Sequence, residues 1–418
     1  MEREIFKDNN KILSVSITAS DVDSLKVSDI TKTGMRVYDK GLIGVSGTTG
    51  EADENRLYEK AKKDLENKIP YPFEIASDLK REVNIKKDII NEKDFVKECE
   101  TILEILKKRY SNFSYSNKIQ LIERNTELSN TKGLSLKHSE NIINFSLAFK
   151  EKSSLNIMDG DIGYAGRSYD RNDVIDYFGQ ALEAYNNEVD LPRDGTYPVA
   201  FFIQDTDTPI LNKFSADMDG RAFGSGTSLF SGKIGKKLFS DDLTLYQTHH
   251  PSDTILTPFF DMEGTINNDL KYTLIEDGVI KTPYTDKKTA NMYGFKNTGN
   301  ARGSYDDVPS LKKSFLEGTN LAIKPGRKTI KELFGGKKGI LSIVASGGDF
   351  NSSGDFGTPI QLAFLFDGNK IIGRLPQISV SSNVYKMFGN NFRGVSSDTV
   401  FKHSNDRLFV ADMDVSRI

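Results

Sequence analysis

The 418-residue sequence is poor in several residue types that often carry chemistry, since it has no tryptophan, one cysteine and four histidines. The single cysteine, Cys99, cannot form an internal disulfide, which agrees with a reducing compartment. The formal net charge is only −3. Such a balance indicates neither a nucleic-acid-binding surface nor a broad surface for anionic membranes.

Long hydrophobic runs are also missing. No window approaches the roughly 20 apolar residues that span a bilayer. The first residues, MEREIFKDNNKILSV, lack the basic start and apolar core of a signal peptide. We therefore expect a cytoplasmic protein with neither a membrane nor a nucleic acid as partner.

What the sequence does contain is enough apolar material, 37% of residues, for two or three folded domains. In the first half, ILSVSIT alternates Leu13, Val15 and Ile17 and predicts a strand, and MRVYDKGLIGVSG predicts a hairpin turning at residues 39–41. Apolar stripes at helical spacing predict three helices. These cover about Ala52 to Lys68, about Glu92 to Arg109 with Cys99 in its buried stripe, and a stretch capped by Asp170 or Asn172.

The second half reads mainly as strands. YPVAFFI is typical of a buried strand, and two hairpins are predicted to turn at Asp277-Gly278 and Asp367-Gly368. Short helices are expected around Lys287 to Tyr293 and Lys328 to Phe334. The turn-rich stretch NNEVDLPRDGTYP favours a division near residue 190. The prediction is an α+β protein with two domains, residues 1–190 and 191–418, the second richer in strands.

The stretch LNKFSADMDGRAFGSGTSLFSGKIG, residues 211–235, collects acids and glycines and invites a ligand site. As an EF-hand loop read from Ser215, it places Asp217 and Asp219 at ligand positions, but it lacks the first ligand and the final glutamate. As a P-loop it has the wrong glycine spacing and no hydroxyl at the magnesium position. Neither a calcium loop nor a nucleotide loop is favoured.

A catalytic nucleophile is equally hard to place. GTSLFSG lacks the G-x-S-x-G pattern of a nucleophile elbow, and no base is recognisable near it. The histidines, at positions 138, 249, 250 and 403, are scattered, and a surface or structural role is expected for each. His249-His250 is the best remaining ligand pair, although adjacent side chains diverge along an extended backbone.

Five ordered landmarks lie between Gly226 and Tyr305: the turn GTSLFSG, the step FDMEGT, an Asp-Gly hairpin, the helix pattern Ala-x-x-x-Gly and the sequence TGNAR. In this order they resemble the TldD/PmbA family of zinc metallopeptidases and their inactivated relatives, often labelled modulators of DNA gyrase. GMRVYDKGLIGVSG near the start and the glycine-rich VASGGDFNSSGDFGTP near the end are similar to that family too. The resemblance covers most of the chain. It implies a two-domain α+β subunit that dimerises, with a peptide-binding space between or beneath the domains.

The resemblance also implies which residues an active member needs. Such members carry His-Glu-x-x-x-His shortly before the Gly-Thr-Ser turn and a cysteine near the C-terminus, which hold zinc while the glutamate activates water. Here LNKFSADMDGRAFGS contains no histidine and no glutamate. The C-terminal region has no cysteine, Cys99 lies in the other domain, and His403 alone cannot form the site. We expect no metal site of the family type and a shortened, flexible replacement for the catalytic helix.

Three hypotheses follow. The first is a non-catalytic, PmbA/TldE-like subunit that pairs with a zinc-bearing TldD-like metallopeptidase subunit and helps to place peptides or unfolded segments, as a homodimer or heterodimer. The second is a metallopeptidase with a displaced metal set drawn from His249, His250, Asp253, Asp217 and Asp219. The third is a homodimeric peptide-binding module unconnected with proteolysis.

Candidate peptide contacts come from the same landmarks. These are the turn residues Gly226, Thr227 and Ser228, and the pair Asn300 and Arg302. Asp261 and Glu263 would share one face if FDMEG were a strand, which allows a functional carboxylate pair; a structural hydrogen-bonding role is the stronger expectation.

Overall fold

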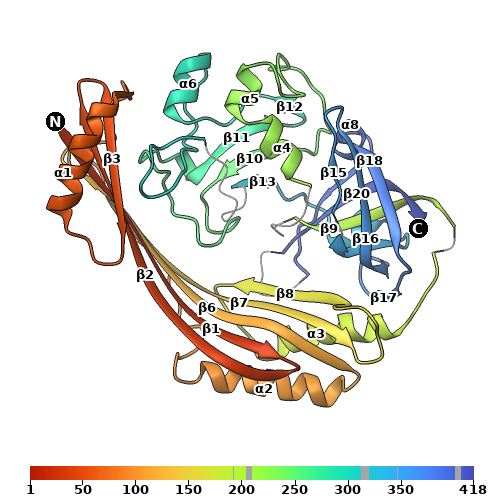
Figure 1. The fold of residues 1–418 in the computed structure, drawn as a ribbon. Helices are drawn as coiled ribbons and strands as arrows, with labels where there is room; N and C mark the ends of the chain where they lie inside the picture. Colours follow the sequence, from red (N-terminus) through yellow and green to blue (C-terminus); the bar gives the residue numbers. More distant parts are fainter. Residues whose placement is uncertain (192, 204–209, 312–319, 346, 401–405) are drawn as a thin grey trace.

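The computed structural model describes the chain except for residues 192, 204–209, 312–319, 346 and 401–405. The predicted α+β class is confirmed, because three sheets and several helices make up the described chain. The two termini lie on opposite sides of the molecule, and a long, curved sheet runs from the side of the N-terminus beneath the second half (Figure 1). In the part that is described, no helix has both the length and the apolar character needed to cross a membrane.

The first sheet has eight strands in the order β4-β3-β2-β1-β6-β7-β5, with β8 also paired to β7. All of its pairings are antiparallel except that of β5 with β7. Its strands are β1 (Glu2–Thr18), β2 (Asp21–Asp39), β3 (Leu42–Thr49), β4 (Ile69–Pro70), β5 (Lys80–Asn84), β6 (Phe113–Asn130), β7 (Ser135–Glu151) and β8 (Gly160–Gly166).

Three helices accompany this sheet: α1 (Glu54–Asp64), α2 (Phe95–Arg109) and α3 (Arg171–Asn186). Leu13, Val15 and Ile17 are buried in one core with the α2 stripe, as their alternation predicts. Cys99 is buried in the same core, and burial raises the pKa of its thiol to about 12. The Asp170 carboxylate accepts hydrogen bonds from the backbone N–H groups of the first turn of α3, which confirms the predicted cap.

The second half contains two further sheets. A small one has the order β12-β11-β10-β13. In the other, β9, β20, β18, β16 and β14 each pair with the next, and β14 pairs back to β9, so these five strands close into a ring. The strands are β9 (Gly195–Phe202), β10 (Leu245–Thr248), β11 (Lys271–Glu276), β12 (Val279–Ile280), β13 (Leu321–Ile323), β14 (Gly339–Ala345), β15 (Asp349–Phe350), β16 (Asp355–Phe366), β17 (Ile371–Arg374), β18 (Ile378–Asn383), β19 (Phe392–Val395) and β20 (Leu408–Arg417).

The helices of the second half are short. They are α4 (Asn212–Asp217), α5 (Gly220–Gly224), α6 (Lys287–Tyr293), α7 (Ile330–Phe334) and α8 (Val384–Met387). The hairpins predicted at Asp277-Gly278 and Asp367-Gly368 join β11 to β12 and β16 to β17. The helix predicted at Lys287 to Tyr293 has those bounds, whereas the one expected from Lys328 starts at Ile330 because Thr329 forms its capping box.

The two halves of the chain share a hydrophobic core. One cluster joins Phe145 of the first sheet and Phe178 of α3 with Phe364 and Val410 of the five-stranded ring. The division near residue 190 lies between α3 and β9, where the chain passes from the first sheet to the ring. The division stays a proposal about chain organisation, because residues on both sides of it are buried in the same hydrophobic core.

Candidate functional site

The α4–α5 segment, residues 212–224, stands directly before the Gly226-Thr227-Ser228 turn. The expectation of a flexible replacement is wrong, because this segment forms two helices with buried residues in each. Phe214 of α4 is fully buried, with its ring centroid 4.5 Å from that of Phe388 and 5.6 Å from that of Phe239. Aromatic packing of this kind is a strong source of core stability, so α4 is a packing element.

The two acids of this segment serve the local backbone. The Asp217 carboxylate accepts the backbone N–H of Leu229 at 2.8 Å and pairs with the Lys213 ammonium at 2.9 Å. The Asp219 carboxylate caps α5 by accepting the N–H groups of Arg221 and Ala222. Both acids therefore hold the fold, and neither is directed toward the other as a ligand pair.

In the turn itself, Ser228 is buried, whereas Gly226 and Thr227 are exposed. The Ser228 hydroxyl is buried, donates to the Asp217 carbonyl at 2.6 Å and accepts the N–H of Phe230. Gly226 has φ of +82°, a conformation that favours glycine, and a Cβ at this position would meet no atom within 4 Å. Thr227 is exposed. Of the three predicted turn residues, Gly226 and Thr227 are accessible to a peptide, and Ser228 supports them.

Asn300 and Arg302 lie in a different place, on the far side of the Tyr284–Thr285 segment. Tyr284 accepts through its carbonyl from the N–H of Gly220 at the start of α5, and Thr285 accepts from the N–H of Asn300. Asn300 is buried, and its side-chain oxygen accepts a hydrogen bond from Arg302 Nε at 3.2 Å. The structure thus links the two predicted groups through one intervening segment.

The FDMEG stretch corrects a further expectation. Residues 259–265 form a turn and no strand, because the Asp261 carboxylate accepts the N–H groups of Glu263 and Thr265, and Gly264 has φ of +71°. A third N–H, that of Ala301, also donates to Asp261, at 2.9 Å. The three bonds give Asp261 the structural role that was expected for it.

His249 and His250 do not form a ligand pair. His249 is half-buried; its Nδ1 donates to the Pro258 carbonyl at 2.7 Å, and its Nε2 accepts from Asn320 at 3.2 Å. Burial lowers the pKa of His249 to about 4, so the ring is neutral at pH 7. His250 Nδ1 instead contacts the Ser252 hydroxyl.

The displaced metal set finds no geometric support. Asp253 is paired with the Lys271 ammonium at 2.7 Å. Over the part of the chain that is described, no group of three or more His, Cys, Asp or Glu side chains is arranged to hold a metal ion. His403 lies outside the described residues.

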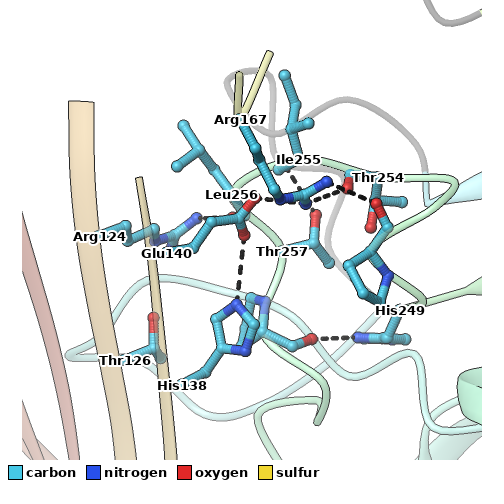
Figure 2. A network of polar contacts seen from close by, with 12 residues as sticks. Arg124, Thr126, His138, Glu140, Arg167, His249, Thr254, Ile255, Leu256 and Thr257 are labelled. Carbon is cyan, nitrogen blue, oxygen red and sulfur yellow. Dashed lines mark hydrogen bonds and ion pairs between the residues drawn. The ribbon is translucent and has the colours of Figure 1, made fainter. Parts of the chain in front are cut away.

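A second polar site was missed by sequence reasoning. Residues 249–265, which we call the arginine-held loop, rest against the curved sheet through three arginines of the first half. Arg167 donates to the Pro251 and Thr254 carbonyls, both at 2.6 Å, Arg124 to the Leu256 carbonyl at 2.8 Å, and Arg36 to the Met262 carbonyl at 2.5 Å (Figure 2 shows the first two).

Each of these arginines also contacts a carboxylate of its own sheet. The pairs are Arg36 with Glu4, Arg124 with Asp8, and Arg167 with Glu140. Burial would raise the pKa of Glu140, but a hydrogen bond from His138 and the charge of Arg167 lower it (Figure 2). A paired arginine keeps its charge balanced while it donates to the loop backbone, so the loop is held by a buried, charge-compensated contact.

Within this loop, Leu256 has a φ of +53°. A left-handed backbone is uncommon for leucine and costs free energy unless its surroundings fix it. Arg124 binds its carbonyl, and its N–H group donates to the Glu140 carboxylate. Arginines within apolar strand patterns, such as Arg36 in MRVYD, were the one sequence signal for this contact.

Residues 194–416 match the family model described as the PmbA/TldA metallopeptidase C-terminal domain. The second half of the chain is therefore a domain of the PmbA/TldA metallopeptidase type. Because the match spans more than half of its residues, the chain belongs to the PmbA/TldD family, as its sequence landmarks predict.

Individual relatives agree with this assignment. An uncharacterized protein of Methanocaldococcus jannaschii is 24% identical over 405 residues, covering 93% of this chain and 90% of that protein. A protein of Saccharolobus solfataricus named as a zinc metalloprotease TldD homolog is 26% identical over 237 residues, 54% of this chain and 50% of its own.

Two solved structures share the fold. A proposed modulator of a DNA gyrase from Thermotoga maritima superposes with a TM-score of 0.79 at 18% identity, covering 99% of this chain and 96% of that one. TldE from Thermococcus kodakarensis superposes with a TM-score of 0.75 at 20% identity, covering 100% and 95%.

The residues before the Gly226 turn do not fit the zinc of such metallopeptidases. Zinc in proteins is held by cysteine, histidine and carboxylate side chains. Among these types α4 carries Asp217 alone, and that carboxylate is engaged by Leu229 and Lys213.

Proposed function

We propose that this chain is a non-catalytic, PmbA/TldE-like subunit of a TldD/PmbA-type metallopeptidase assembly. The observation that carries the proposal is the packing of α4: this helix belongs to the segment that leads into the Gly226 turn, and its Phe214 side chain packs into an aromatic core. A residue buried in this way contributes stability and no ligand. Chemistry in the assembly then belongs to a partner with intact metal ligands.

The role we assign to the chain is to place an extended peptide or unfolded segment. Beside α4 lies β15, which ends the order of its sheet. Lys213 of α4 donates to the Asn351 carbonyl just after this strand, at 3.2 Å. A free strand edge recognises peptides through main-chain hydrogen bonds without demanding one sequence. Gly226 and Thr227 are the exposed candidates for further contacts, and Arg302, which is half-buried, is a third candidate.

The experiment is a reconstitution. The purified chain, a relative from the same source that carries the His-Glu-x-x-x-His helix, and their mixture are each incubated with casein and zinc. We expect cleavage by the mixture, none by this chain alone, and co-elution of the two chains on gel filtration. Zinc-dependent cleavage by this chain alone would contradict the proposal.

A variant of the exposed turn tests the proposed peptide contacts. Thr227→Trp places a large side chain on the exposed turn without disturbing the buried Ser228. It is expected to weaken cleavage by the mixture while co-elution persists; Lys60→Trp, on the exposed face of α1, is the matched control. Co-elution without any gain in cleavage would favour a binding module unconnected with proteolysis.

A further inference from the structure

The turn at residues 261–263 contains a second buried carboxyl group, that of Glu263, whose hydrogen-bond partners come from two other segments of the chain. One oxygen of Glu263 accepts the Tyr71 hydroxyl at 2.8 Å, and the other accepts the backbone N–H of Lys287 at 3.0 Å, where α6 begins. Glu263 and Asp261 are both at least 96% buried. They lie two residues apart and are joined by the hydrogen bond from the Glu263 N–H to Asp261.

Positive charge is scarce around this pair. Arg36, a buried cation that binds the Met262 carbonyl of this turn, already pairs with Glu4 at 3.1 Å, and Tyr38 donates to the same Glu4 oxygen. The Lys287 ammonium donates to the Glu74 carbonyl, and its charge lowers the pKa of Asp261 and Glu263 by less than burial raises it. The cluster therefore holds three carboxyl groups, those of Glu4, Asp261 and Glu263, against one buried guanidinium. Like charges this close and this buried do not all ionise together.

The proton can be assigned within the pair. Asp261 accepts three backbone N–H groups, an arrangement suited to a carboxylate. Glu263 accepts from Tyr71 and from one N–H, and both bonds tolerate a neutral carboxyl group. Burial, and after it the negative charge of Asp261, raises the pKa of Glu263 to about 8. Burial also raises the pKa of the Tyr71 and Tyr38 phenols, which keeps them neutral.

We infer that the 261–263 turn is a latch, which fastens the 300–302 segment to the rest of the molecule, and that Glu263 carries its proton. Asp261 binds the N–H of Ala301, and the N–H of Met262 donates to the Ala301 carbonyl. The same turn is fastened to the curved sheet through Arg36 and Met262. Loss of the Glu263 proton adds an uncompensated charge to the turn and loosens both attachments.

The sign of the pH dependence follows by linkage. In the closed latch, Glu263 is protonated. In the opened latch, the solvated Glu263 carboxyl group loses this proton above its ordinary pKa. Closure is therefore strongest below about pH 4.5 and weakens as the pH rises to about 8, where the closed form also ionises. One proton released on opening corresponds to a roughly tenfold rise in the opening equilibrium per pH unit in this window.

Hydrogen exchange of the whole chain, corrected for the intrinsic exchange rate at each pH, tests the latch. From pH 6 to pH 8, opening of peptides covering residues 259–265 and 299–303 is expected to increase by about 50-fold in the native chain, because the closed form is itself half ionised at pH 8. In Glu263→Gln, which keeps the shape of the neutral side chain, it is expected to stay constant. The exposed Glu59→Gln is the matched control and is expected to follow the native profile.

A second readout protects the test against a variant that fails to fold. The infrared band of a protonated carboxylic acid is expected in the native protein at pH 7 and is expected to vanish above pH 9. The latch is refuted if native and Glu263→Gln chains have the same slope, or if no such band is present at pH 7. Neither result depends on peptide cleavage or on a partner subunit, so failure of the latch is distinguishable from failure of the proposed function.

Discussion

The α4–α5 segment and the arginine-held loop treat charge in opposite ways. The first leads into the Gly226 turn and is built on aromatic contacts around Phe214; Asp219 caps α5, and Asp217 accepts the Leu229 N–H and pairs with Lys213. The second keeps buried charges and compensates each arginine with a carboxylate. The comparison shows that the three arginine–carboxylate pairs hold the loop of the second half against the sheet of the first half. The α4–α5 segment instead contributes packing.

Phe214→Ala tests the packing side of this comparison with the largest expected effect. Removing a fully buried phenylalanine ring leaves a cavity among Phe230, Phe239 and Phe388, and the expected loss is about 3–5 kcal/mol of unfolding free energy. Urea titration measures it. Phe214→Leu, which refills part of the space, is expected to lose clearly less; equal losses for the two variants would show that the ring is not tightly packed.

Arg36→Met tests the charged side with an effect of similar size. It strands Glu4 in a buried position without its cation, which costs about 3–5 kcal/mol. The double variant Glu4→Gln/Arg36→Met removes both charges and is expected to recover a large part of that loss. A double-mutant cycle from urea titrations measures the coupling, and additive losses would argue against a compensated pair.

Mild acid is expected to weaken the arginine-held loop through His249. Because the folded pKa of His249 is about 4 and its ordinary value 6.5, the unfolded chain binds the proton first. The contribution of neutral His249 to the free energy of unfolding is on the order of 3 kcal/mol. It is complete above about pH 6.5 and is lost as the pH falls to about 4. Unfolding titrations of the native chain and of His249→Gln at pH 7 and pH 5 should show a smaller pH difference in the variant, and equal differences would contradict this account.

The smallest effect is expected at the cap of α5. Asp219→Ala removes the acceptor for the N–H groups of Arg221 and Ala222 and should cost about 1 kcal/mol. Asp219→Ser supplies another capping oxygen and should restore most of the stability. If alanine and serine destabilise the chain equally, the carboxylate has a role beyond capping.

Much of the fold could be predicted because its signals are local. Turn residues determine the hairpins at residues 39–41, 277–278 and 367–368, and apolar stripes locate α2 and α3. Helix ends were less accurate: α1 ends at Asp64, four residues earlier than expected, followed by a 3-10 turn and the left-handed Lys68. The closing of five strands into a ring depends on pairings such as β14 with β9, which no local pattern encodes.

Those features of the site that depend on a sequence motif could be predicted, and those that depend on tertiary contacts could not. The absence of metal ligands before Gly226 is readable from the residues alone. That Phe214 meets Phe388 is not, because 174 positions separate them along the chain. Asp261 and Glu263 look like an alternating strand pair, and only the hydrogen bonds from Thr265 and Ala301 show that they belong to a turn.

The zinc content of the isolated chain tests the central claim most directly. The protein is dialysed against a small excess of zinc and then against metal-free buffer, and zinc per chain is measured by elemental analysis, with a relative carrying His-Glu-x-x-x-His treated alongside. The account predicts about one zinc per chain in the relative and a level near background here. One tightly held zinc per chain in this protein would contradict it.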